Sequence, residues 1–285
     1  NLNSWRSYIL FWSLMLGLGN SVTSIVALSG EDFGTNHSLS FDGSNDEVDF
    51  TTANFQEKLS ASEGNFKVSG SVSVWARLNT TGANGQLWDF YIDDDNRINI
   101  QYKHNVTHKY VLTWRGGGAQ KTADSATGLT HEGDGNFHHI VCTWDKGSAN
   151  EMKVYIDAEL ADTVSLGTVE ISGDFDDTAD GTLGQSGAGG VEFLSGTSFN
   201  GNADFNGFLD DFAVYSDVLT LSEVQTLYNG GTSDQTNVDT VGTIIAHWTF
   251  NEGTGSIVTD RIGGFVGTFG ASGKNPTFST TNAGA

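Results

Sequence analysis

NGNADFNGFLDDFAVYSDVLTLSEVQTLYNGG, residues 200–231, is the stretch that decides the fold. Its first half, GFLDDFAVY, alternates apolar and polar residues and ends in an aromatic residue, which predicts a half-buried strand. Its second half begins at Thr220 or Ser222, either of which suits a helix N-cap, and its apolar residues then recur at helical spacing. Because two glycines follow, we expect a strand, a short turn and one small helix that ends before Gly230.

The composition of the chain is that of a turn-rich β protein. Of its 285 residues, 37 are glycine, one is proline and 11% are aromatic, and this length suits one large all-β domain or two small ones. The formal net charge is −22, with only 13 Lys and Arg residues. Since phosphate contacts need clustered basic side chains, a nucleic-acid partner is not expected. The single cysteine, Cys142, excludes an intrachain disulfide and is expected to be a small buried hydrophobe.

Three other segments combine with the first. Residues 37–50, HSLSFDGSNDEVDF, predict a strand pair around a turn, and residues 135–163, GNFHHIVCTWDKGSANEMKVYIDAELADT, predict a hairpin. Residues 244–269, IIAHWTFNEGTGSIVTDRIGGFVGTF, carry a third motif. Together with the LDD and LSE motifs at 209–211 and 221–223, these segments resemble a laminin-G-like domain of the concanavalin A-like lectin/glucanase superfamily.

The resemblance implies an all-β fold, a concanavalin A-like jelly-roll sandwich of two antiparallel sheets with one short helix near residues 222–229. The domain would occupy residues 31–285. Its relatives normally begin with the motif that comes last here, so residues 244–270 are expected to close the same sandwich in a permuted order, which is tolerated when chain ends lie close together. Strand exchange with a neighbouring subunit is the alternative.

Residues 1–30 form a separate, hydrophobic N-terminal segment. The apolar run YILFWSLMLGLG, residues 8–19, is shorter than the roughly 20 residues that span a bilayer. Its basic start and small-residue exit are also typical of a signal peptide. We expect an arm that mediates assembly into a homo-oligomer or a larger particle, and a membrane anchor or an uncleaved signal is the alternative.

Calcium is the metal that acidic turns favour, because Ca²⁺ prefers several carboxylate and carbonyl oxygens. The resemblance implies a site where three segments meet. They are the motif at residues 244–269, the turn at FDG (residues 41–43) and the strand that carries the LDD motif (residues 209–211). The matching residues are Asp42, Asp210, Asp211 and Glu252. Asn251 stands where relatives often carry Asp, and capping of turns by the aspartates is the alternative interpretation.

Histidines offer a second kind of metal ligand. His131, His138 and His139 are close together in the sequence. Adjacent residues of a strand point to opposite faces, so His138 and His139 cannot easily share one zinc ion. We therefore expect one of them to be packed and the other exposed.

Sugar binding needs aromatic faces together with a few polar groups. Four aromatic residues in the predicted strands of residues 86–114, of which 102–114 is expected to be one strand, are the candidates. They are Trp88, Tyr91, Tyr102 and Trp114. Packing in the core is the alternative, since aromatic residues of a sandwich are more often buried than exposed.

Glycoside hydrolysis, which some members of this superfamily perform, needs two carboxylates on one face, about 5 Å apart in retaining enzymes. Glu47 and Asp49 meet part of this requirement, but Thr51 stands where a third acid would be. The sequence therefore predicts no enzyme.

The expected function is a non-catalytic surface module for adhesion or glycan recognition, displayed on a virion, filament or cell surface. Its expected partner is a glycan or cell-surface receptor, and its expected location is extracellular or on a virion. The alternative is a structural subunit, such as a phage decoration or fibre protein, that assembles through residues 1–30. A glycoside hydrolase is the third candidate.

Overall fold

The computed structural model describes residues 37–50, 53–60, 63, 65–80, 84–175, 190–194, 205–270 and 273–284. The predicted N-terminal arm, residues 1–30, and Thr51 lie outside the described residues. No helix within the described ranges is long and apolar enough to cross a membrane.

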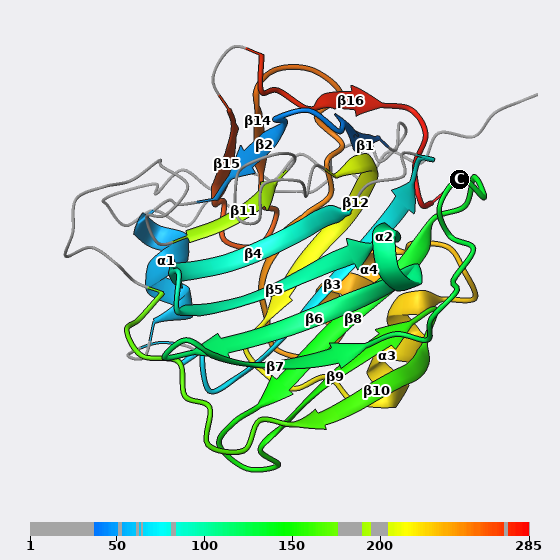
Figure 1. Ribbon diagram of the computed structural model, residues 1–285. Coiled ribbons are helices and arrows are strands. Elements are labelled where there is room, and N and C mark those ends of the chain that lie inside the picture. The colour runs from blue at the N-terminus through cyan, green and yellow to red at the C-terminus, as the bar shows by residue number, and fades with distance from the viewer. Residues whose placement is uncertain are drawn as a thin grey trace, which may run out of the picture. The chain divides into compact units, whose positions relative to one another are not determined.

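Two antiparallel β-sheets pack face to face (Figure 1). The strands of the first sheet are β1 (Ser38–Asp42), β3 (Ser69–Leu78), β8 (His138–Asp145), β9 (Glu151–Ile156), β10 (Glu159–Ser165), β12 (Asn206–Tyr215), β13 (Ile244–Trp248) and β16 (Thr277–Ser279). Their order is β10-β9-β8-β3-β12-β1-β16, and β13 also pairs with β12.

The second sheet is built from the strands β2 (Glu47–Asp49), β4 (Gly85–Asp93), β5 (Asn96–Lys103), β6 (Lys109–Gly116), β7 (Ala119–Asp124), β11 (Gly190–Leu194), β14 (Ile257–Thr259) and β15 (Val266–Phe269). Their order is β14-β15-β2-β11-β4-β5-β6-β7. The architecture is the predicted all-β jelly-roll sandwich.

The alternation of side chains along each strand builds the core between the sheets. On β3, Val72 and Val74 are buried in the core, whereas Ser71 and Ser73 point to the opposite face and form hydrogen bonds there. Burial of one such apolar side chain contributes roughly 1.5–3 kcal/mol. The core is rich in aromatic rings, such as Phe66, which packs edge-on against Trp144 with ring centroids 4.7 Å apart.

Two helices cover the outer face of the first sheet. Helix α3 (Leu221–Tyr228) and helix α4 (Gln235–Thr240) enclose a second, smaller apolar cluster against that face. Of the two predicted N-caps, Thr220 is the one used, and it forms a capping box with Glu223. The helix predicted near residues 222–229 is thus confirmed, whereas α4 was not predicted because its six residues are too short for a clear apolar period.

Two further short helices also escaped prediction. They are α1 (Ala53–Leu59) and α2 (His104–Thr107). The prediction of one strand over residues 102–114 is wrong, because α2 separates β5 from β6 there. The chain turns back at His108, whose φ of 47° is left-handed.

The C-terminal segment adds strands to both sheets of the same chain. Strand β13 pairs with β12, β15 pairs with β2, and β16 pairs with β1. Strand β12 therefore pairs with β1 along its first half and with β13 along its second half, while β3 lies on its other side. Its register shifts between Asp210 and Ala213, and Asp211 has a left-handed φ of 42°. This irregularity places the two predicted acids where β12 passes from one partner to the next.

Candidate functional site

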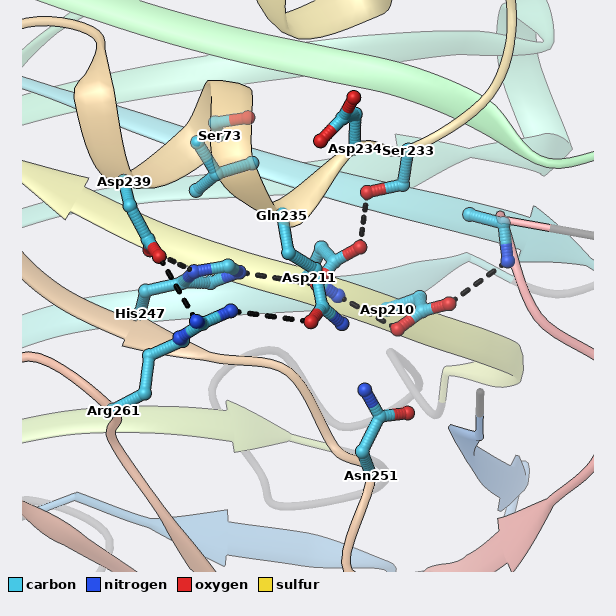
Figure 2. Close-up of polar contacts among 12 residues, drawn as sticks. Ser73, Asp210, Asp211, Ser233, Asp234, Gln235, Asp239, His247, Asn251 and Arg261 are labelled. Atoms are coloured by element: carbon cyan, nitrogen blue, oxygen red, sulfur yellow. Dashed lines mark hydrogen bonds and ion pairs between the residues drawn. The ribbon is translucent and has the colours of Figure 1, made fainter. Parts of the chain in front are cut away.

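The paired acids of β12 lie in a buried polar network (Figure 2). Asp210 accepts hydrogen bonds from the backbone N–H of Asp211, at 2.9 Å, and of Ala283, at 2.8 Å. Burial, followed by the charge of Asp211, raises the pKa of Asp210 well above its ordinary value. Asp211 in turn accepts a hydrogen bond from the Ser233 hydroxyl. Every carboxylate oxygen of this pair therefore has a partner within the protein, once the contact of Asp211 with His247 is included.

His247 is the cation of this network. Its Nε2 lies 3.1 Å from Asp211 and its Nδ1 lies 2.8 Å from Asp239, and its side chain is 0% exposed. Burial lowers its pKa, but the hydrogen bonds and charges of the two aspartates outweigh burial and raise it overall. A protonated ring can donate from both nitrogens, one to each aspartate, so this geometry together with the raised pKa favours the imidazolium. Arg261 adds a second cation, 3.2 Å from Asp239.

The other two predicted calcium ligands also bind parts of the protein. Asp42 accepts a hydrogen bond from the backbone N–H of Ser44 at 2.7 Å, and Glu252 accepts one from the backbone N–H of Thr259 at 2.7 Å. Around Asp211 the neighbouring cation is an imidazolium, which does not suit a set of oxygen ligands for Ca²⁺. These contacts fit turn capping and ion pairing better than a calcium site, and calcium binding stays a prediction from the resemblance.

Three of the four aromatic candidates for sugar binding lie in the core. Trp88, Tyr102 and Trp114 are buried between the sheets and present no ring face to a sugar. Core packing, the alternative interpretation, therefore applies to them. Tyr91 is half-buried on the outer face of the second sheet, where the Arg97 guanidinium lies 4.6 Å from the centroid of its ring.

Next to Tyr91, polar residues from β4 and β5 form a closed cluster. Asp89 lies 3.6 Å from Arg97, and each of these residues is only 1% exposed. Burial raises the pKa of Asp89 to about 7, although Arg97 and Asn99 oppose this shift. The low exposure argues against direct ligand access to these side chains.

Glu47 and Asp49 lie on β2, and Val48 between them is buried in the core. Glu47 lies 3.8 Å from Lys274. Burial raises the pKa of Glu47, and the positive charge of Lys274 opposes this shift without cancelling it. A raised pKa is a property of glycosidase acids, but it also follows from partial burial alone.

An open pocket of about 360 Å³ lies at one end of the sandwich. Its lining comes from α2 and its C-cap, from the loop between β7 and β8, and from Thr80 after β3. Figure 1 shows α2 between β5 and β6. The lining residues are Thr80, His104, His108, Gly128, Leu129, Thr130 and Glu132. Backbone hydrogen bonds hold the loop in place: Gly128 donates to Thr107 at 2.7 Å, and Gly133 donates to Leu78 at 2.9 Å.

Two histidines and one glutamate converge in this pocket. The Nδ1 atom of His104 is 2.5 Å from Glu132 Oε2, and the Nδ1 atom of His108 is 3.8 Å from the same oxygen. The hydroxyl of Tyr102 lies 3.3 Å from His108 Nδ1. Burial and the charge of Glu132 raise the pKa of Tyr102 to about 12. This group was not predicted, although the spacing of the two histidines in HNVTH, residues 104–108, was a usable signal.

The three histidines considered from the sequence as possible zinc ligands occupy two other sites. His138 lies between Asp157, at 2.7 Å from Nδ1, and Asp134, at 2.9 Å from Nε2, and it stacks on His131 with ring centroids 3.4 Å apart. His139 points to the opposite face, where its Nε2 is 2.8 Å from Ser73 Oγ. The opposite orientations agree with the prediction, but neither histidine is fully exposed, since His138 has a side-chain exposure of 12%.

Known proteins share this architecture. Residues 41–225 match the model of the Concanavalin A-like lectin/glucanases superfamily, which is more than half of the chain. No curated protein sequence matches the chain. A crystal structure from Bacteroides ovatus ATCC 8483, of a protein for which carbohydrate binding is proposed, is 13% identical with a TM-score of 0.54. That match covers 86% of this chain, which thus spans about 60% of the length of the other.

Two further solved structures match with lower TM-scores. The CBM40 of the Ruminococcus gnavus IT-sialidase, bound to α2,3 sialyllactose, is 15% identical, with a TM-score of 0.48 over 67% of this chain and 96% of its own. The native heptameric SAP-like pentraxin of Limulus polyphemus is 15% identical, with a TM-score of 0.46 over 82% of this chain and 95% of its own. The match to the family model runs from the end of β1 to the start of α3 and covers more than half of the chain, so this chain belongs to the concanavalin A-like lectin/glucanases superfamily.

Proposed function

We propose that this chain is a non-catalytic glycan-recognition module and that the pocket at the end of the sandwich is its binding site. The observation that carries the proposal is an open pocket of about 360 Å³ with convergent polar groups. This volume lies in the range of small-ligand sites, roughly 300–1,000 Å³. Superfamily membership and the carbohydrate binding proposed for the Bacteroides ovatus protein support the same function.

The lining of the pocket matches the chemistry of a sugar. The Glu132 carboxylate can accept hydrogen bonds from sugar hydroxyls, and the hydroxyls of Thr80 and Thr130 can both donate and accept. Leu129 offers an apolar contact for the C–H groups of a pyranose ring. The net charge of −22 disfavours heavily sulfated glycans, because the field of the whole protein repels polyanions.

A glycan array tests the function, and a pocket-blocking variant tests the site. Thr130 is exposed and lines the pocket, so Thr130→Trp is expected to fill the cavity and abolish glycan binding without affecting the core. Thr254→Trp is the matched control, because Thr254 is also exposed but lies outside the lining. Failure of the wild-type chain to bind any glycan on a broad array would refute the function. Unchanged affinity in Thr130→Trp would refute the site.

Display on a cell surface, filament or virion, and hence an extracellular location, belongs to the same proposal. A receptor carrying glycans is the partner that it implies. The alternative of a structural subunit depends on residues 1–30, which lie outside the described residues, and it stays a prediction. Hydrolysis of a β-glucan that disappears in Glu47→Gln would instead favour the glycoside hydrolase.

A further inference from the structure

We propose that His104, His108 and Glu132 bind one divalent transition-metal ion, for which Zn²⁺ fits best. One ligand atom from each of the three side chains lies within 4.8 Å of the other two. This inference goes beyond glycan recognition and does not rest on it, because the metal can be tested with no sugar present.

The distances between the ligand atoms suit a single small ion. Zn²⁺ binds imidazole nitrogen and carboxylate oxygen at about 2.0–2.2 Å, so two ligands of a tetrahedral ion lie about 3.3 Å apart. The two histidine nitrogens lie 2.5 and 3.8 Å from Glu132 Oε2, on either side of that separation. Small rotations of His104 and His108, which have side-chain exposures of 27% and 46%, can bring both to the required distance.

The backbone brings the ligands together from two parts of the chain. His104 is the first residue of α2 and His108 is its C-cap, so they lie one helical turn apart on one side, with ring centroids 4.6 Å apart. Glu132 comes from the loop between β7 and β8, which forms an isolated bridge with Leu78 at the end of β3. Its side chain is 7% exposed, so the carboxylate is held at the base of the group.

Ligand type decides which ion is favoured. Two imidazoles and one carboxylate suit Zn²⁺ or a similar transition ion, whereas Ca²⁺ and Mg²⁺ prefer oxygen ligands. Three protein ligands leave a fourth position of a tetrahedral ion for water or for a ligand atom in the pocket. The site would therefore be an open metal centre at the edge of the 360 Å³ pocket.

A second histidine group of the described residues, made of His131, His138 and Asp157, is a poorer candidate. Both ring nitrogens of His138 already lie within hydrogen-bond distance of aspartates. The hydrogen bonds of those aspartates outweigh burial and raise the pKa of His138, so a metal would have to displace a proton that the aspartates stabilise. This group nevertheless supplies a control for the experiment.

Zinc binding to the whole chain, measured by equilibrium dialysis with metal analysis, tests the proposal. We expect one Zn²⁺ per wild-type chain and a melting temperature that rises with Zn²⁺ concentration, since a ligand that binds only the folded state stabilises it. The double variant His104→Gln/His108→Gln should weaken binding by more than the roughly 10- to 100-fold that loss of an outer-shell partner costs. Glu132→Gln should weaken binding in the same direction.

His131→Gln is the matched control and should leave both the stoichiometry and the affinity unchanged. A wild-type chain that binds no Zn²⁺, or a double variant that is folded by circular dichroism and still binds normally, would overturn the proposal. Loss of zinc in His131→Gln alone would also overturn it, by assigning the ion to the other group. Glycan binding that survives without zinc would leave the proposed function intact, so the two proposals can fail separately.

Discussion

His247 and His138 are each held between two aspartates, but they lie in very different surroundings. His247 is 0% exposed and joins β13 to β12 through Asp211 and to α4 through Asp239. His138 has an exposure of 12% and joins β8 to the turn at Asp157 and to the loop at Asp134, beside the pocket. The same arrangement of charges therefore serves to hold the helix layer on the first sheet in one place and to hold a loop in the other.

Burial sets the value of each arrangement. Removing one partner of a buried ion pair typically costs about 3–5 kcal/mol because a charge remains without compensation, whereas exposed pairs contribute about 0–1 kcal/mol. The carboxylates around His138 also retain backbone partners: Asp134 accepts from Asn136 N–H at 2.8 Å, and Asp157 accepts from His139 N–H at 2.9 Å. We therefore expect the His247 network to matter much more for stability than the His138 network.

The largest expected effect is that of His247→Ala. The substitution removes the imidazolium and leaves Asp211 and Asp239 facing a cavity, so it should lower the free energy of unfolding by about 3–5 kcal/mol. Urea denaturation of the wild type and the variant measures this difference. A loss below about 1 kcal/mol would show that Arg261 and water compensate the two carboxylates.

The second effect is the pH dependence of that difference. The folded-state pKa of His247 is raised, so its contribution is fully present below the unfolded pKa of about 6.5 and is lost as pH rises through the folded pKa. The gap in unfolding free energy between wild type and His247→Ala should thus be larger at about pH 6 than at about pH 9. A gap that grows with pH would contradict the imidazolium assignment.

The third effect is smaller and concerns His138→Gln. The amide can still donate to one aspartate, and the other carboxylate keeps its backbone hydrogen bond, so the expected loss is about 1 kcal/mol. The same denaturation experiment as for His247→Ala allows direct comparison of the two sites. Equal losses at His138 and His247 would remove the distinction based on burial.

The smallest expected effect is a gain in stability from Ala158→Gly. Asp157 and Ala158 form the turn between β9 and β10 with φ of 51° and 64°, values that favour glycine at the second position. Removing the Cβ of Ala158 should raise the free energy of unfolding by about 0.5–1 kcal/mol without affecting the contact of Asp157 with His138. A loss of stability would indicate that the Ala158 side chain contributes more by its packing beside the helices than its backbone strain costs.

The fold could be predicted because its signals are local. The alternation in residues 206–215 and the capping residues Thr220 and Glu223 are read within one element, and they identify β12 and α3 without knowledge of any neighbour. Helix α2 was missed because its four residues make up only about one turn, so its sequence shows no repeating apolar pattern. Its omission also hid the way in which His104 and His108 reach the pocket.

The sequence by itself determined the superfamily, the two-sheet sandwich, the presence of a short helix near residues 222–229 and the net charge of −22. Only the tertiary structure decided which aromatic residues are core, that Asp210 and Asp211 face protein partners including His247, and that Glu132 meets two histidines more than twenty residues away. The physical reason is that periodicity assigns residues to the two faces of a strand. It does not say what covers each face, or which distant loop contributes the other side of a site.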